Sequence, residues 1–183
     1  LDKVRAMIAE SGPGFAKHFL KELPNQRFKS AGVRGTEVHV LAEQYIQGKE
    51  IEVAEHLVPY VEGYAAFISD WAPVPVHDEL VVASREHMIA GTLDSIQDIP
   101  GLGRCLVDYK TSNYVYGEHA LQVAAYRHME VYLDSEGNEH PMVEVDRCFI
   151  LHIKPHDYQL IPVLAGPDEF ARFLKARDNY VSN

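Results

Sequence analysis

Two aspartates and a lysine stand at the ends of two neighbouring strand-like runs. Asp94 ends one apolar run, and Asp108, Tyr109 and Lys110 end the next. Side chains alternate along a strand, so Asp108 and Lys110 are expected on one face and Tyr109 on the other. If the two runs pair as a hairpin, two carboxylates and an ammonium group converge. Hard oxygen ligands beside a lysine suit a divalent cation and a hydrolytic water.

The rest of the pattern predicts the elements that hold these residues. Apolar residues recur at helical spacing before residue 72, and the period changes to two after Pro73 and Pro75. Helices are predicted over 2–11, 14–22, 34–47, 57–71, 117–133 and 167–180, and strands over 79–85, 87–96, 104–111, 146–154 and 157–164, with a polar loop at 134–140. A helix between the third and fourth strands predicts a parallel crossover. The expected α/β fold is a mixed central sheet of about five strands flanked by helices.

Length and composition suit one globular domain. The chain has 183 residues, 46% hydrophobic and 24% charged, which is ordinary for a soluble domain. We expect N-terminal helices over 1–72 and a catalytic α/β core over 73–183. No apolar run approaches the roughly 20 residues that span a bilayer, and no secretory signal pattern is visible. A cytoplasmic location without membrane attachment is therefore expected.

The charge balance bears on binding to nucleic acid. A formal net charge of −10 argues against broad, nonspecific contact with phosphates. The stretch 23–36 nevertheless contains no acid, and it carries Arg27, Lys29 and Arg34. This stretch is either a solvated loop or a site of phosphate contact.

Three further residues could join the acidic pair. His39 lies in the helix predicted over 34–47, where a structural role is the alternative. Gln122 and Tyr126 stand four residues apart on a predicted helix and share a face, and the alternative is a core tyrosine beside a surface glutamine. Glu79 opens the first predicted strand as a partner of the site or as a surface acid.

Taken together, these residues resemble the PD-(D/E)XK nuclease superfamily, and within it the RecB-like branch that includes the CRISPR-adaptation nucleases. The resemblance rests on four motifs in order: G-x-x-x-H at 35–39, A-G-T-L-D at 90–94, D-Y-K-T at 108–111 and Q-x-x-x-Y at 122–126. Each falls on the expected type of element. The resemblance implies a restriction-endonuclease-like core.

The resemblance also implies the ligands of a metal ion. His39, Asp94 and Asp108 would bind Mg²⁺ or Mn²⁺, with the backbone carbonyl of Tyr109 as a fourth ligand. A site with a histidine ligand suits Mn²⁺ better than an all-oxygen site does. The two cysteines, Cys105 and Cys148, are too few for the four thiolates of an iron–sulfur cluster. No such cluster is expected, which puts a role in spacer acquisition in doubt.

The implied catalytic set is Asp94, Asp108, Lys110, Gln122 and Tyr126. Lys110 would orient or deprotonate the attacking water and offset charge on the scissile phosphate. Gln122 and Tyr126 would brace the site or touch the nucleic-acid strand. A phosphodiester is anionic and resists hydroxide, so hydrolysis needs a cation that neutralises charge and acidifies water.

The expected function is a metal-dependent DNA nuclease. It would be an exonuclease or end-processing enzyme of DNA recombination, repair or phage replication, in a bacterial or phage-infected cell. Its partners would be single-stranded DNA or duplex ends, with a helicase or recombination protein as a further candidate. Two alternatives stay open: an inactive nucleic-acid- or partner-binding protein on the same fold, and an unrelated α/β protein in which the acids and the lysine form a surface ion pair.

Overall fold

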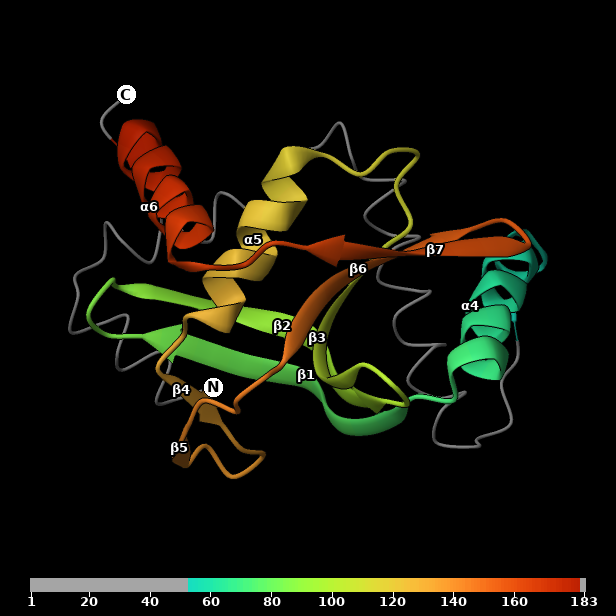
Figure 1. Cartoon of the computed structure of the whole chain (residues 1–183), viewed down its shortest axis with the longest axis horizontal. Helices are drawn as coiled ribbons and strands as arrows, with labels where there is room; N and C mark the ends of the chain where they lie inside the picture. Colours follow the sequence, from blue (N-terminus) through green and yellow to red (C-terminus); the bar gives the residue numbers. More distant parts are fainter. Residues whose placement is uncertain (1–52, 182–183) are drawn as a thin grey trace.

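The computed structural model describes residues 53–181, so the helices predicted over 2–11, 14–22 and 34–47 lie outside the described residues. The described part forms one seven-stranded mixed sheet in the order β5-β4-β1-β2-β3-β6-β7 (Figure 1). Its strands are β1 (Val74–Ser84), β2 (Ile89–Ile99), β3 (Gly103–Lys110), β4 (Val131–Leu133), β5 (Glu139–Pro141), β6 (Arg147–Lys154) and β7 (Asp157–Val163). Only the β3–β6 pair is parallel within this part of the chain.

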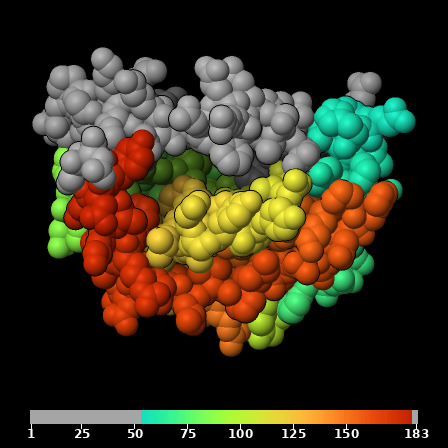
Figure 2. All heavy atoms as spheres, turned by 90° about the horizontal axis from the view of Figure 1, so that it is seen from above, coloured from blue at the N-terminus to red at the C-terminus, as the bar shows by residue number. Residues whose placement is uncertain are grey.

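Helices cover both faces of the sheet. A 3₁₀ turn η2 (Glu55–Leu57) leads into α4 (Val58–Trp71), which covers one face, while α5 (Gly117–Arg127) and α6 (Pro167–Val181) cover the other. The alternation along β3 makes this visible, because Leu106 packs in the cluster that includes Val123 of α5, whereas its neighbour Val107 packs in the cluster that includes Phe67 of α4. Figure 2 shows α5 at the surface between α6 and the β6–β7 strands.

The crossover that the sequence predicts is present. β3 runs antiparallel to β2 and parallel to β6, and α5 lies between β3 and β6 along the chain. Parallel neighbours need a long connection, which a helix packed on the sheet supplies. The α/β class and the mixed sheet flanked by helices are therefore confirmed, and the sheet has seven strands rather than about five.

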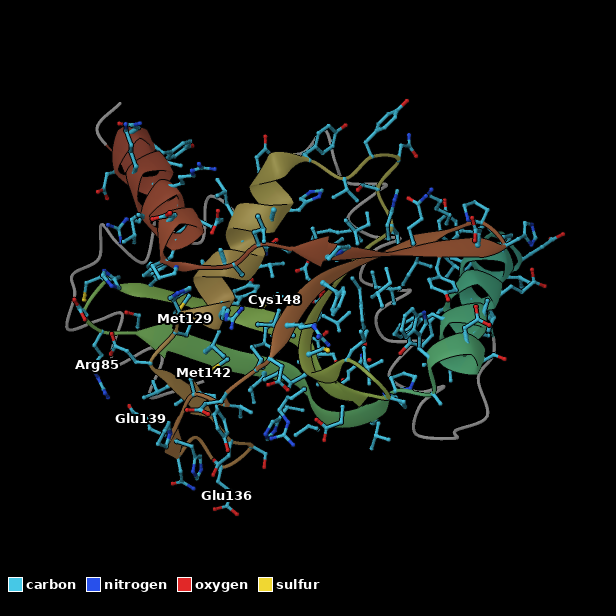
Figure 3. The ribbon with its side chains drawn as sticks, viewed as in Figure 1. Arg85, Met129, Glu136, Glu139, Met142 and Cys148 are labelled. Atoms are coloured by element: carbon cyan, nitrogen blue, oxygen red, sulfur yellow. The ribbon has the colours of Figure 1, made fainter. Side chains whose placement is uncertain are left out.

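The two additional strands come from the segment predicted as the end of a helix and a polar loop. α5 ends at Arg127 instead of continuing to 133, and the backbone N–H of Glu130 donates to Ala83 in β1. β4 then pairs with β1, and β5 pairs with β4. Arg85, which follows β1, binds both carboxylate oxygens of Glu139 in β5 at 2.5 and 2.6 Å (Figure 3). Pairing with the sheet outweighs the local helical pattern here.

Strand β1 also begins earlier than predicted, at Val74 rather than 79. Its register against β2 shifts between Pro75 and His77. A proline lacks the N–H that a regular ladder uses, so it is tolerated where the pairing is irregular. Pro75, after which the sequence pattern placed the start of the strand, therefore lies inside β1.

Two further features concern membrane-spanning helices and the cysteines. Among residues 53–181, no helix is long and apolar enough to cross a membrane. Cys105 and Cys148 are both buried free thiols, and they belong to the apolar clusters on opposite faces of the sheet.

Candidate active site

The end of β3 presents a buried ion pair toward α5. The Lys110 Nζ lies 2.5 Å from Oδ2 of Asp108. The Asp108 side chain is 2% exposed and that of Lys110 is 18% exposed, so the pair is largely shielded from water. Their intervening neighbour Tyr109 belongs to the cluster on the α4 face. The alternation expected from the sequence is therefore what the strand adopts.

Asp94 meets this pair from strand β2. The last paired residues on the β2–β3 ladder are Ser95 and Val107, so Asp94 stands opposite Asp108 one step further along. There the carboxylate of Asp94 accepts a hydrogen bond from the backbone N–H of Tyr109 at 2.6 Å. A side chain thus accepts from the N–H that follows the last pair of the ladder, and this contact fixes the Asp94 carboxylate beside Asp108.

The pKa of Asp94 reflects its removal from water. Burial raises the pKa of Asp94 to about 6, against the lowering effects of the Lys110 ammonium and of the hydrogen bond from the Tyr109 N–H. Near neutral pH the group is still mostly ionised. Two carboxylates at opposing positions of β2 and β3 then share the influence of one ammonium group, an arrangement to which a further cation would be attracted.

Helix α5 lies over the acids with a polar pair. The Gln122 amide Nε2 donates to the Tyr126 hydroxyl at 3.0 Å. Burial raises the pKa of Tyr126, the Gln122 hydrogen bond opposes the shift, and the nearby charges of Asp108 and Asp94 add to it. The tyrosine therefore stays a neutral hydroxyl near both acids. The two α5 residues share the face that their spacing predicts.

Gly91 explains how the tyrosine comes so close to the sheet. A Cβ atom at this position would lie 2.8 Å from Cε1 of Tyr126, closer than side chains pack. The glycine in the A-G-T-L-D motif therefore leaves room for the ring above β2. We expect that Gly91→Ala would push the tyrosine away from the acids.

Two nearby residues were not among the predicted catalytic set. His119 begins the same stripe of α5, three residues before Gln122, and its Nδ1 accepts the backbone N–H of Tyr116. Burial lowers the pKa of His119, Lys110 lowers it further, and Asp108 opposes the change, which places the imidazole near the ion pair. Its i, i+3 spacing was the available sequence signal.

Glu79 was considered as a partner of the site, and it lies across from Asp94. Its flanking residues Asp78 and Leu80 pair with Ser95 and Leu93. Glu79 is exposed and has a φ of 50°, a left-handed conformation that costs free energy for a non-glycine residue in a strand. The charge of Glu79 also contributes to the raised pKa of Tyr126. Strain beside the acids is a feature that the sequence pattern does not reveal.

The remaining predicted site residues cannot be placed. His39, Arg27, Lys29 and Arg34 lie outside the described residues. Within 53–181, no three histidine, cysteine or acidic side chains group closely enough to hold a metal ion. The structure therefore brings together Asp94, Asp108, Lys110, Gln122 and Tyr126, and it leaves the third metal ligand and the basic stretch as predictions.

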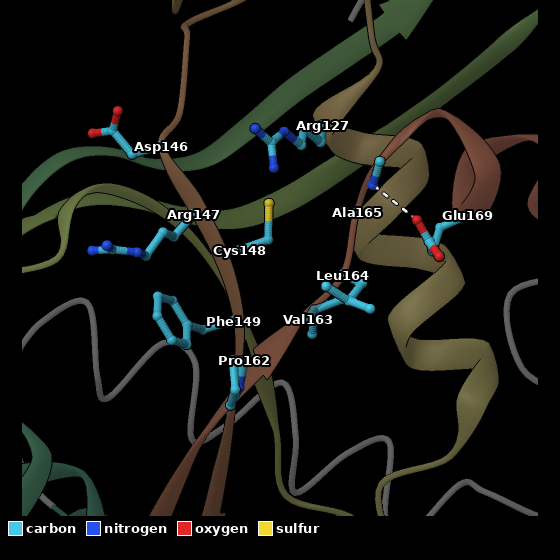
Figure 4. A pocket seen from close by; sticks show the side chains of 11 residues that line it. Arg127, Asp146, Arg147, Cys148, Phe149, Pro162, Val163, Leu164, Ala165 and Glu169 are labelled. Carbon is cyan, nitrogen blue, oxygen red and sulfur yellow. Dashed lines mark hydrogen bonds between the residues drawn. The ribbon is translucent and has the colours of Figure 1, made fainter.

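A concave region elsewhere is a weaker candidate. A cavity of about 360 Å³ lies at the start of β6, where Arg147 pairs in register with Cys105, whereas Lys110 pairs with His152 toward the other end of the same ladder. Figure 4 shows Arg127 and the Cys148 thiol beside it. Burial raises the pKa of Cys148, so its thiol is unreactive. We assign no chemistry to this cavity.

Comparisons with known proteins give no family for the chain. No family model matches it, and no curated protein matches it. Among solved structures, one similar chain is described as "Crystal structure of SSO0001", with 13% sequence identity, coverage of 85% of this chain and 68% of that chain, and a TM-score of 0.38. A likeness at that level carries no argument about function.

Proposed function

We propose that this protein is a metal-dependent DNA nuclease of the PD-(D/E)XK type. One observation carries the proposal: Asp94, midway along β2, stands opposite Asp108, near the end of β3, and the Lys110 ammonium acts on both carboxylates. A plain surface ion pair does not call for a buried Asp108 and a half-buried Asp94 around one lysine. A phosphodiesterase does, because it must hold a cation and a base beside an anionic substrate.

The topology is compatible with the core that the resemblance implies. An antiparallel β2–β3 pair, a crossover through α5 and a parallel β6 surround the acids, and the Q-x-x-x-Y pair lies over them. This arrangement supports a restriction-endonuclease-like core. The short β4 and β5 strands extend the sheet beyond β1 and lie away from the proposed chemistry.

The residues present fit a hard divalent cation. Asp94 and Asp108 offer carboxylate oxygens, and Tyr109, which follows Asp108 on β3, offers its backbone carbonyl. Burial raises the pKa of Asp94 to about 6, and a bound cation would favour the ionised form further. His39 would complete the set. Mg²⁺ or Mn²⁺ bound there would supply charge neutralisation and a more acidic water.

Lys110 is the residue we assign to the water and the phosphate. Its ammonium lies against Asp108, which holds the Nζ at a fixed point beside the acids. From there it orients a water and offsets charge that builds on the phosphate oxygens. The Tyr126 hydroxyl, held by Gln122, is a donor that can brace the acids or the strand.

Basic residues are the proposed contacts with the phosphates of the DNA substrate. The acid-free stretch with Arg27, Lys29 and Arg34 remains the expected phosphate contact. In the described part, α6 carries a second set of basic residues, Arg172, Lys175 and Arg177, although Arg177 already pairs with Asp178 and donates to the carbonyl of His87. We propose a cytoplasmic enzyme that acts at DNA ends, with a helicase or recombination protein as partner.

The direct test is a cleavage assay. The purified chain is incubated with Mn²⁺ or Mg²⁺ on end-labelled linear and closed-circular DNA, each single-stranded and duplex. Asp108→Asn, purified in parallel, controls for contaminating nuclease. We expect cleavage that stops in EDTA and in the variant. Binding without cleavage would favour the inactive alternative on the same fold, and neither binding nor cleavage would favour an unrelated α/β protein.

A further inference from the structure

Two exposed aromatic rings stand beside the proposed active site. Tyr114 and Tyr116 lie in the loop 111–116, which joins Lys110 at the end of β3 to α5. Tyr114 is 67% exposed and Tyr116 is 50% exposed. Exposed tyrosines are common singly, but two in one loop directly after the catalytic lysine form a local aromatic surface.

The loop that carries these rings is tied down at several points. His152 in β6 donates from Nε2 to the carbonyl of Ser112 at 2.7 Å, and the Ser112 hydroxyl donates to the carbonyl of Tyr114 at 2.7 Å. At the other end, the backbone N–H of His119 donates to the carbonyl of Tyr116 at 3.1 Å. The two backbones are thus fixed to the same scaffold as Lys110, so little ordering is needed when a ligand binds.

The rings do not stack on one another. The centroids of Tyr114 and Tyr116 are 6.3 Å apart with planes at 60°, and Tyr116 meets the His119 ring edge-on at 5.7 Å and 72°. Parallel stacking covers whole ring faces, whereas tilted and edge-on pairs cover less of them. Beyond Tyr116, a side chain at Gly117 would meet no further atom of residues 53–181 within 4 Å.

The ligand that suits such rings beside a phosphate site is a nucleobase. Every base has a flat face that stacks on an aromatic side chain, and proteins that hold single strands use this contact without reading sequence. Tyr114 is four positions after Lys110, a backbone span of at most about 14 Å. One single-strand binding site covers roughly 4–16 nucleotides, so a base could reach the rings while a phosphate lies at Lys110.

The net charge of the protein also favours base stacking as a means of holding DNA. A protein with a formal net charge of −10 cannot rely on a wide basic surface to hold DNA. Stacking does not depend on positive charge and loses less affinity with salt. Bases within a duplex are stacked on their neighbours and paired, so they are not available to the rings.

We infer that Tyr114 and Tyr116 form a stacking platform for unpaired bases, so that single-stranded DNA is the preferred substrate. This inference rests on the proposed nuclease function, since it places the scissile phosphate near Lys110. It deepens that proposal by naming the class of strand.

The test measures DNA affinity by fluorescence anisotropy in EDTA, where cleavage is absent. The probes are a labelled oligothymidine of about twelve nucleotides, the same backbone with abasic sites, and a blunt hairpin duplex. Alanine at both tyrosines should weaken oligothymidine binding by about tenfold or more and leave the duplex and abasic probes nearly unchanged. Phenylalanine at both positions should bind like the parent. Tyr180→Ala, at a 55% exposed tyrosine on α6, is the matched control.

The abasic probe guards against a folding artefact, because it removes the bases and leaves the protein intact. The parent should bind it about as weakly as the double alanine variant binds oligothymidine. Equal affinity of parent and variant for oligothymidine overturns the platform, and so does an equal loss on all three probes. Cleavage of the same DNA with Mn²⁺ is scored separately. Cleavage without an effect of the tyrosines on binding supports the nuclease function and overturns the platform. An effect of the tyrosines on binding without cleavage supports the platform and overturns the nuclease function.

Discussion

The two faces of strand β3 carry opposite kinds of polar chemistry. Toward α5, Asp108 and Lys110 form a buried ion pair with Asp94 close by. Toward α4, the Tyr109 hydroxyl accepts a hydrogen bond from Gln97 at 2.5 Å. That second face is built mainly from hydroxyl and amide groups: Gln97 also donates to Ser95, and Ser95 donates to a single carboxylate, that of Asp78, at 2.6 Å.

This difference indicates that the polar groups on the α4 face stabilise the fold, whereas those on the α5 face are arranged for a ligand. Neutral hydrogen-bonded groups can be buried at modest cost. A carboxylate removed from water is unfavourable, and the pKa of Asp94, which burial raises, records that cost. A chain that keeps such a cluster, next to a strained Glu79, is expected to gain something from it. Here we propose that the gain is cation and phosphate binding.

The largest expected effect that tests this contrast is on catalysis at Lys110. Lys110→Ala should lower cleavage by about 10²-fold or more, as for loss of a positioned electrostatic or acid–base group. Mn²⁺ affinity should be largely unchanged, because the ammonium is not a ligand. Arginine should not restore activity, since its planar fork does not replace a compact ammonium.

Lys154→Ala is the matched control for this prediction, at a lysine that ends the neighbouring strand β6. Initial rates on labelled DNA with Mn²⁺ give the comparison. If Lys110→Ala cleaves at the rate of the control, the water is activated without the lysine.

A smaller effect, on stability, is expected from the pH dependence of Asp94. Its folded pKa of about 6 lies above its ordinary value of 3.8, so the folded state holds the proton more tightly than the unfolded state does. In the absence of metal, stability should therefore fall as pH rises from about 4 through 6, by roughly 2–3 kcal/mol for this group. Asp94→Asn should remove that fall and stabilise the metal-free protein at pH 7.

The control for this prediction is Asp98→Asn, on the same strand. Arg104 lowers the pKa of Asp98, so that acid contributes stability above its unfolded pKa that is lost as pH falls, the opposite sign. Urea unfolding in EDTA across this pH range measures both variants. An Asp94→Asn protein with the same pH profile as the parent would show that the carboxylate is not under electrostatic strain.

The smallest effect should come from the α4 face. Tyr109→Phe removes the hydroxyl that Gln97 contacts and keeps the backbone N–H that Asp94 uses. Unfolding free energy should drop by about 1–3 kcal/mol because a buried amide loses a partner. Cleavage by the folded protein should stay at the parental rate. A catalytic defect without a stability change would mean that the two faces are not separate.

Much of the architecture around the acids follows from local patterns in the sequence. Period-two alternation was enough to put Asp108 and Lys110 on one face of β3, and four-residue spacing was enough to put Gln122 and Tyr126 on one face of α5. The crossover between β3 and β6 followed from a helix placed between two strands. These features depend on residues close together in the chain.

Other features depend on contacts that no local pattern contains. β4 and β5 are three residues each, too short to show alternation, and β4 forms because Val131–Leu133 adds to the edge of β1. The hydrogen bond from the Tyr109 N–H to Asp94 joins residues 15 positions apart. The closeness of Gly91 to Tyr126 likewise needs the fold. The raised pKa of Asp94 and the strain at Glu79 could be found only with the structure.

Calorimetric titration of Mn²⁺ tests the central claim most directly. The parent, Asp108→Asn and Asp78→Asn are compared, the last being an acid of the same sheet that lies in the hydrogen-bonded chain toward α4. We predict that the parent and Asp78→Asn bind Mn²⁺ alike and that Asp108→Asn does not bind it, because removing one carboxylate leaves too little charge for a hard cation. Unchanged Mn²⁺ affinity in Asp108→Asn would contradict the assignment of this cluster as a metal-dependent active site.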